Sequence, residues 1–170
     1  YDRGYLITGG ITPAEKTHGL LIKTDINGYV LWDKVIGAPD QVFINKTIYD
    51  EDGNLYIFGC INIQSGSISL VIKLNVCGEL QWCRQFNFEE YAYNFINDGI
   101  FSKNGDLLAV AYMHMNDDYN DRIFIFCITP DGEYLWKKSY ASCANYPSFE
   151  ERIGSRIQFF DDIYIISGYV

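Results

Sequence analysis

The amino-acid sequence predicts an all-β protein: a β-propeller of four-stranded antiparallel blades, with about three blades and the start of a fourth. Three observations lead to this prediction. A glycine and tryptophan pattern recurs at intervals of 50 and 54 residues, short apolar runs alternate with turn residues, and aromatic residues make up 16% of the chain. Aromatic and β-branched runs separated by glycine-containing turns are typical of proteins with many short strands.

Two sequence blocks define the repeat. The first places a glycine four residues before a tryptophan, at Gly28 and Trp32, Gly78 and Trp82, and Gly132 and Trp136. The second is an apolar block that recurs four times, starting at Tyr5, Leu55, Leu107 and Ile163. Internal repeats of this length indicate stacked units, and we expect boundaries near residues 1–43, 44–94, 95–152 and 153–170.

Each complete repeat is expected to contain four strands. The apolar block that recurs four times is one strand, and the strand after it is formed by the runs at 20–23, 69–74 and 122–128. A cluster of Asp, Asn and Gly then predicts a tight hairpin turn, because these residues adopt positive φ readily. The strand after the turn carries the tryptophan. A further apolar stretch, at 44–49, 95–101 and 153–159, completes the set.

Four strands in such a repeat, with one tryptophan each, favour a propeller blade over the alternatives. The coils of a β-solenoid are usually shorter and lack hairpin turns, and a β-sandwich has no internal repeat. Gly28, Trp32, Gly78, Trp82, Gly132 and Trp136 are the predicted structural docking residues. Each tryptophan would lie across the adjoining blade. Three blades and part of a fourth are expected to be incomplete on their own.

Variation in length is confined to one predicted face. The stretch from each tryptophan to the turn before the next apolar block lengthens along the chain. The connection that follows the apolar block lengthens as well, whereas the hairpin between each glycine and tryptophan keeps its length. Binding residues often lie on such loops. Tyr91, Tyr93, Tyr146 and Phe149 are therefore the candidate ligand-binding residues, for a protein or a glycan partner. The alternative is that these rings only pack onto the ends of the blades.

Composition excludes several classes of partner. The formal net charge of −9 and a pI near 4.5 argue against nucleic-acid binding, which needs clustered basic residues. No apolar run reaches the roughly 18 residues of a membrane span. The sequence starts at Tyr1, without an initiator methionine or signal peptide, so we expect its targeting information to lie elsewhere.

We predict no metal site, cofactor or catalytic residue. The five cysteines form no C-x-x-C pair, and small buried thiols with at most one bridge are the expected state. The run 117–121 is rich in Asp and offers either a calcium site or a solvated acidic loop, but it does not fit an EF-hand. His18 and His114 are both expected in loops. Asn45 starts an N-glycosylation pattern, but its predicted place in an apolar strand argues against a glycan.

The string Lys-Thr-Asp-Ile-Asn-Gly-Tyr-Val-Leu-Trp at 23–32, preceded by Gly-Tyr-Leu-Ile-Thr-Gly-Gly at 4–10, resembles known propeller repeats. Similar repeats occur in secreted and cell-surface proteins of Bacteroidota, many of them type IX secretion cargo. The spacing from glycine to tryptophan is also similar to the docking motif of pyrroloquinoline-quinone-like blades. The resemblance implies an extracellular or bacterial cell-surface location, with an outer-membrane or secretion-complex partner. It specifies a fold more closely than an activity.

Three functions follow as hypotheses. The first is a non-catalytic scaffold that binds protein or glycan through one loop face. The second is part of an enzyme propeller, of the quinoprotein or glycan-cleaving kind, whose active residues lie outside this 170-residue segment. The chain has no adjacent cysteine pair and no arginines at equivalent repeat positions, so the second hypothesis gains no support from it. The third is a structural subunit of an outer-membrane assembly.

Overall fold

The computed structural model describes residues 4–37, 39–88, 93–114, 122–141 and 153–169. Within these ranges the regular structure consists of β-strands and one short 3-10 helix. The strands form antiparallel sheets, which confirms the predicted all-β class. They do not close into a barrel or a ring within the part of the chain that is described.

Consecutive strands pair with one another except at three places, between β3 and β4, β7 and β8, and β11 and β12. These breaks divide the fold into four units. Unit 1 comprises β1 (Leu6–Ile11), η1 (Pro13–Glu15), β2 (His18–Thr24) and β3 (Val30–Ile36). Unit 2 comprises β4 (Gln41–Tyr49), β5 (Leu55–Ile63), β6 (Gly66–Leu74) and β7 (Leu80–Phe86). Unit 3 comprises β8 (Tyr93–Phe101), β9 (Leu107–His114), β10 (Arg122–Ile128) and β11 (Tyr134–Ala141). Unit 4 comprises β12 (Ile153–Phe160) and β13 (Ile163–Tyr169).

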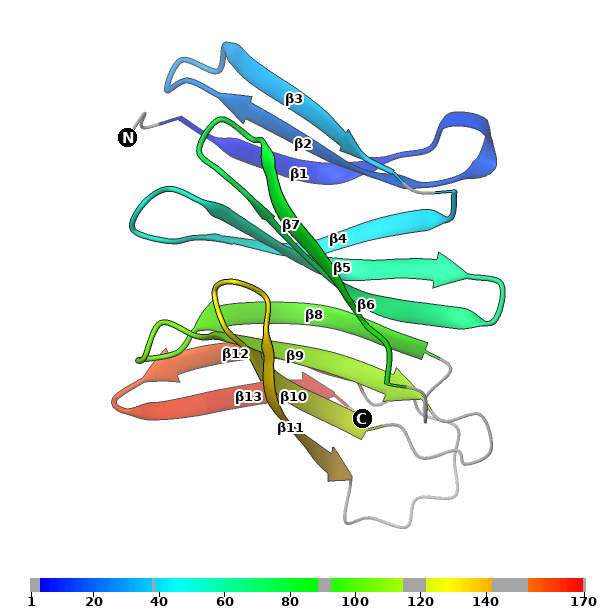
Figure 1. The fold of residues 1–170 in the computed structure, drawn as a ribbon, viewed down its shortest axis with the longest axis vertical. Coiled ribbons are helices and arrows are strands. Elements are labelled where there is room, and N and C mark those ends of the chain that lie inside the picture. Colours follow the sequence, from blue (N-terminus) through cyan, green and yellow to red (C-terminus); the bar gives the residue numbers. More distant parts are fainter. Residues whose placement is uncertain (1–3, 38, 89–92, 115–121, 142–152, 170) are drawn as a thin grey trace.

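Units 1, 2 and 3 follow one another in chain order along the long axis of the molecule (Figure 1). A short parallel contact between Ser67 of β6 and Tyr93 of β8 joins units 2 and 3 into one continuous sheet. A backbone hydrogen bond from the N–H of Val42 to the carbonyl oxygen of Thr17 joins units 1 and 2, and the other contacts between the described units involve side chains. The sheets therefore meet mainly through their faces.

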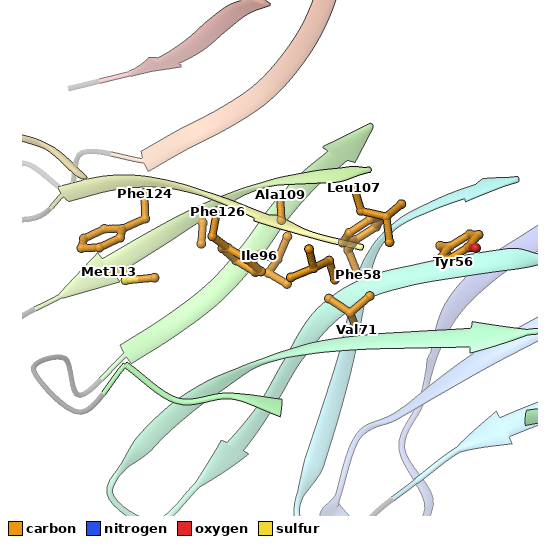
Figure 2. Packing of buried hydrophobic residues seen from close by; sticks show 11 residues of the cluster. Tyr56, Phe58, Val71, Ile96, Leu107, Ala109, Met113, Phe124 and Phe126 are labelled. Atoms are coloured by element: carbon orange, nitrogen blue, oxygen red, sulfur yellow. The ribbon is translucent and has the colours of Figure 1, made fainter. Parts of the chain in front are cut away.

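A separate apolar cluster fills each junction between units. Strand β5 shows why: Ile57 belongs to the cluster shared with unit 1, and the next residue, Phe58, belongs to the cluster shared with unit 3. Successive side chains of a strand point to opposite faces, so a strand covered on both faces must be apolar throughout. Figure 2 shows the cluster between units 2 and 3, where Phe58 and Val71 lie near Ile96 and Leu107. A third cluster, which includes Val110 and Ile157, joins units 3 and 4.

Five hairpin turns share one conformation. Each has five residues, an Asp, Asn, Ser or Thr in first place, and a glycine with positive φ in fourth place; they span 25–29, 50–54, 75–79, 102–106 and 129–133. The first side chain accepts hydrogen bonds from backbone N–H groups within its own turn. Asp25 Oδ1, for example, accepts from the N–H groups of Asn27 and Tyr29 at 2.8 and 2.9 Å. The fourth residue has φ between 76° and 88° in these turns, a conformation in which glycine carries little steric cost.

In unit 4, the position of β13 differs by one residue from the alignment of the repeats in the sequence. A β-bulge lies between Ile44 and Lys46 in β4, and a matching bulge lies between Gly154 and Arg156 in β12. Matching these bulges makes Tyr164, and not Ile163, the counterpart of Leu55. The cause is a shorter turn, because Asp161 and Asp162 both adopt positive φ in a two-residue connection. A shift of one residue exchanges the two faces of a strand.

No helix among the described residues is long and apolar enough to cross a membrane.

Candidate functional site

Connections of varying length gather at one end of the units, which we call the variable-loop end. Strand β2 begins beside the end of β3, because Gly19 pairs with Ile36. The connection from β1 to β2 and the connection from β3 to β4 therefore leave the sheet at the same end, and the five-residue turns lie at the other (Figure 1). Connections between successive units span residues 37–40, 87–92 and 142–152. The registers thus agree with the predicted separation of variable loops from constant turns, except that the two-residue turn from β12 to β13 lies at the end of the constant turns.

Tyr93 lies at the variable-loop end, at the start of β8, with 47% of its surface exposed. It is paired with His114, the last residue of β9, and the two rings are 5.9 Å apart between centroids. The neighbouring Asn94 holds this corner to unit 2, since its N–H donates to Ser67 Oγ at 2.9 Å. An exposed phenol ring beside an imidazole offers both a stacking face and polar groups to a ligand.

The other three candidate ligand-binding residues, Tyr91, Tyr146 and Phe149, lie outside the described residues, as does the acidic run 117–121. Two of these segments are close in the sequence to Tyr93 and His114. Tyr91 precedes Tyr93 by two residues, and the acidic run begins three residues after His114. Tyr93 is therefore the described residue of the predicted ligand-binding face, and the partly buried His114 lies beside it.

The prediction that both histidines lie in loops is wrong. His18 is the first residue of β2 and His114 is the last residue of β9. The His18 ring packs so closely on the backbone that a Cβ added at Gly37 would lie 2.9 Å from Nδ1. His18 Nδ1 is buried and accepts no hydrogen bond from the described residues. Sequence reasoning missed these strand ends because polar residues usually signal turns.

At the opposite end, each of two tryptophans packs against a turn glycine in the next unit. A Cβ added at Gly78 would lie 3.1 Å from the Trp32 ring and 2.8 Å from Lys34 Cε. A Cβ added at Gly132 would lie 3.3 Å from the Trp82 ring and 3.0 Å from Arg84 Cγ. We call each tryptophan with the basic residue two positions later a clamp; the clamps are Trp32 with Lys34, Trp82 with Arg84, and Trp136 with Lys138.

Hydrogen bonds reinforce the clamp between units 2 and 3. Trp82 Nε1 donates to the carbonyl oxygen of Pro130, two residues before the turn glycine, at 3.1 Å. Lys73 Nζ and the Tyr56 hydroxyl lie 3.4 and 3.5 Å from the same oxygen. Burial raises the pKa of Tyr56, so its hydroxyl remains a donor at neutral pH. One carbonyl of unit 3 thus accepts from two donors of unit 2, Trp82 and Lys73, and the Tyr56 hydroxyl lies between this oxygen and the closer Asp50 Oδ2 at 3.3 Å.

A matched pair of substitutions tests the clamp. Gly132 and Gly105 have nearly the same φ, 83° and 85°, but only Gly132 faces a tryptophan, and a Cβ at Gly105 would meet nothing within 4 Å. Asparagine tolerates this backbone conformation. We expect Gly105→Asn to lower the free energy of unfolding by less than about 1 kcal/mol, and Gly132→Asn to lower it by about 2 kcal/mol more through overpacking. Urea unfolding of both variants measures the difference, and equal effects would contradict a close contact at Gly132.

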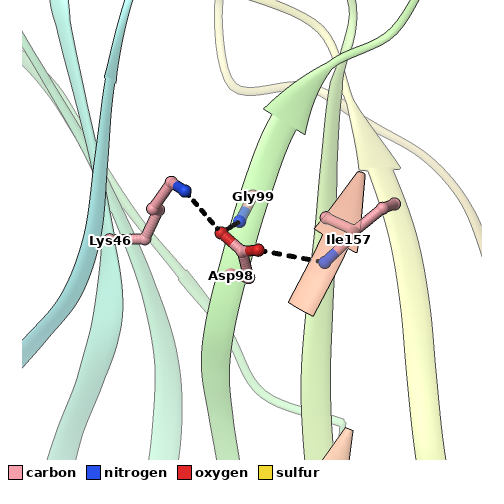
Figure 3. Close-up of polar contacts among 4 residues, drawn as sticks. All are labelled: Lys46, Asp98, Gly99 and Ile157. Atoms are coloured by element: carbon pink, nitrogen blue, oxygen red, sulfur yellow. Dashed lines mark hydrogen bonds and ion pairs between the residues drawn. The ribbon is translucent and has the colours of Figure 1, made fainter. Parts of the chain in front are cut away.

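A buried carboxylate links three units (Figure 3). Asp98 follows the bulge in β8 and is 5% exposed. Its Oδ1 accepts from Lys46 Nζ of unit 2 and from the N–H of Gly99, both at 2.9 Å, and its Oδ2 accepts from the N–H of Ile157 of unit 4 at 2.9 Å. Lys46 and Asp98 occupy the same position after the bulge in their units. Sequence analysis missed this site because both residues lie within stretches assigned as apolar strands.

The described cysteines Cys60, Cys77, Cys83 and Cys127 are free thiols, and Cys143 lies outside the described residues. Burial raises the pKa of Cys60 to about 11. Burial and the nearby Asp106 raise the pKa of Cys127 to about 11 as well. A raised pKa keeps both groups as thiols at neutral pH, and the thiolate is the reactive form. Cys60 and Cys127 therefore serve as small apolar residues of the core.

Among the described residues, no group of three or more His, Cys, Asp or Glu side chains is arranged to hold a metal ion. No known protein family matches this chain, and no curated protein shows significant sequence similarity to it.

Proposed function

We propose that this chain is part of a non-catalytic β-propeller scaffold that binds a protein or glycan through its variable-loop end. The main support is the division of the two ends of the stacked units. One end has five turns of a single conformation and the clamps, and the other has connections of different length with the exposed Tyr93 beside the partly buried His114. A scaffold of constant packing with variable loops is the usual arrangement of a binding domain.

The propeller arrangement is supported by how the first strands of successive units meet. Asn45 Nδ2 of β4 donates to the carbonyl oxygen of Ile96 in β8 at 2.7 Å. The N–H of Ile157 in β12 donates to Asp98 of the same β8 strand. Hydrogen bonds thus join the first strands of three successive units, whereas the strands with the tryptophans lie at the outer side. In a propeller, the blades are arranged radially in the same way around a central channel.

Aromatic residues at the variable-loop end indicate the class of ligand. Tyr93 presents a half-exposed ring, and Tyr91, Tyr146 and Phe149 add aromatic residues in the connections that lead into β8 and β12. Aromatic faces stack on sugar rings and anchor protein partners. The net charge of −9 disfavours a polyanionic ligand.

An extracellular or bacterial cell-surface location is part of the proposal. It rests on the resemblance of the repeat to secreted and cell-surface propellers of Bacteroidota. A partner in an outer-membrane or secretion complex remains a prediction on the same basis.

Substitution of the aromatic residues at the variable-loop end tests the proposed function. We expect the combined change of Tyr91, Tyr93, Tyr146 and Phe149 to serine to weaken binding at least tenfold, because a lost stacking ring costs about 1 kcal/mol and four are removed. The free energy of unfolding is expected to change little, since Tyr93 lies at the rim of the core. Binding is measured on a glycan microarray and on immobilised bacterial outer-membrane vesicles.

The control changes the opposite end. Asn27, Tyr29 and Asp131 lie exposed on five-residue turns, and their combined replacement by Ala, Ser and Ala is expected to leave binding unchanged. If the control variant loses binding while the aromatic variant keeps it, the functional face is the constant-turn end and the proposal is wrong.

A further inference from the structure

In the third clamp Lys138 lies beside Trp136, but no turn glycine of the described residues packs against this tryptophan. Trp136 of β11 is 41% exposed, whereas Trp32 and Trp82 are partly buried against apolar clusters. Lys138 already lies beside it, with Nζ 5.9 Å from the centre of a Trp136 ring. Tyr134 and Leu135 of the same strand are also exposed. The clamp residues of unit 3 therefore present an apolar surface that is covered at the two preceding junctions.

The edge of β13 lies open at the junction of units 3 and 4, among the described strands. Strands β5 and β9 are paired along both edges, with β4 and β6 and with β8 and β10. Their counterpart β13 pairs with β12, and no other described strand lies along its second edge. Ile165 of β13 is 44% exposed, while its counterpart Tyr56 in β5 is fully buried. Open edges with apolar side chains are sites where another strand can add.

One hairpin occupies both positions at each internal junction. In unit 2, β6 lies along the edge of β5, and the turn from β6 to β7 places Gly78 against Trp32. In unit 3, β10 lies along β9, and the turn from β10 to β11 places Gly132 against Trp82. The open edge of β13 and the Trp136–Lys138 clamp are therefore two halves of one surface.

We propose that the β13 edge and the Trp136–Lys138 clamp form a docking site for a β-hairpin whose five-residue turn has glycine in fourth place. The first strand of the hairpin adds antiparallel to β13. Its turn glycine packs between the indole ring and the lysine stem. The proposal rests on the two internal junctions and does not depend on ligand binding at the variable-loop end.

A folded second copy of the described chain offers this site none of the hairpins that fill the internal junctions. The first strands of those hairpins are already paired along the edge that would have to meet β13: β2 with β1, β6 with β5, and β10 with β9. The two other glycine turns belong to the β4–β5 and β8–β9 hairpins, where β8 contacts β6 at Ser67 and the second edge of β4 donates the Val42 N–H to the carbonyl oxygen of Thr17 in unit 1. The occupant must carry a hairpin whose first strand has a free edge. This requirement selects a hairpin of the repeat's own type that is not already part of a complete unit.

The contacts at the internal junctions define the specificity of the site. Backbone hydrogen bonds to β13 would supply affinity with little dependence on sequence. Glycine is required in the turn, because a Cβ would approach the clamp to about 3 Å, as at Gly78 and Gly132. Trp136 Nε1 would donate to the carbonyl two residues before the glycine, as Trp82 Nε1 donates to Pro130.

A peptide from the chain itself provides the probe. Residues 66–86 contain β6, the Gly78 turn and β7, and as a free peptide they offer an unpaired first strand. The peptide carries a fluorescent label and Cys77→Ser and Cys83→Ser, which prevent disulfide formation. Binding to the full chain of 170 residues is followed by fluorescence anisotropy.

We expect saturable binding that Gly78→Val in the peptide weakens at least tenfold. Trp136→Ala in the protein is expected to have the same effect, and Tyr29→Ser, at an exposed position of unit 1, is expected to have none. If Trp136→Ala fails to fold, as judged by circular dichroism, the comparison of the two peptides with the unaltered chain still decides the question.

Three results would overturn the proposal. The first is failure of the unaltered chain to bind the peptide at millimolar concentration. The second is equal binding of the Gly78→Val peptide, because it would show a non-specific apolar contact. Self-association of the chain that needs Trp136 and excludes the peptide is the third, because a second copy would then be the occupant.

Discussion

Replacement of Trp82 by alanine is expected to lower the free energy of unfolding by about 3 to 5 kcal/mol, the range observed for large core aromatics. Trp82 packs against the cluster between units 2 and 3, lies against Gly132, and donates to the carbonyl oxygen of Pro130. Its removal leaves a gap where two sheets meet. Urea unfolding followed by circular dichroism measures the loss.

Two controls separate the contributions. Trp82→Phe keeps an aromatic ring and loses the indole N–H, so it is expected to cost about 1 to 2 kcal/mol. Trp136→Ala removes the same residue type from the same repeat position, but at an exposed site, and is expected to cost less than about 1 kcal/mol in the chain alone. An unchanged urea midpoint for Trp82→Ala would exclude a docking role for this tryptophan.

Replacement of Asp98 by alanine is expected to destabilise the chain by a similar amount, about 3 to 5 kcal/mol. The change leaves the N–H groups of Gly99 and Ile157 without their acceptor and removes the partner of Lys46. A buried donor without a partner costs about 1 to 3 kcal/mol, and two are created here. Amide hydrogen exchange at Gly99 and Ile157 reports directly on the lost bonds.

Asp98→Asn is the matched control for this site. It keeps the size of the side chain and one oxygen acceptor, so it is expected to cost roughly half as much as the alanine change. If Asp98→Ala and Asp98→Asn prove equally mild, and exchange at Ile157 stays slow, Asp98 does not hold unit 4 to unit 3.

Local features of the fold could be predicted from the sequence because their causes lie within a few residues. The turns at Gly28, Gly78 and Gly132 follow from a glycine with an Asp, Asn or Thr three residues earlier, whose side chain accepts from the turn itself. The strands follow from short apolar runs between such turns. The predicted positions of the strands that carry the tryptophans agree with β3, β7 and β11.

Features that depend on residues far apart in sequence could not be predicted. Lys46, Asp98 and Ile157 come from three units, and no local pattern marks them as partners. The register of β13 could not be predicted because the two-residue turn before it shifts the strand by one position and leaves the apolar pattern unchanged. The basic residue of the clamp was present in the sequence at Lys34, Arg84 and Lys138, and an alignment extended two positions beyond each tryptophan would have found it.

The pairing of neighbours in sequence also determines how this fold can form. Apart from the contact of Ser67 with Tyr93, every pairing between described strands joins two that are consecutive in the chain. Contacts of short sequence separation close with little loss of chain entropy, so each hairpin can form on its own and the units can assemble one after another. Stability in such a chain is approximately a sum of the units and the junctions between them. A weakened junction would therefore divide unfolding into two steps at that point, with the units on either side retaining their own sheets.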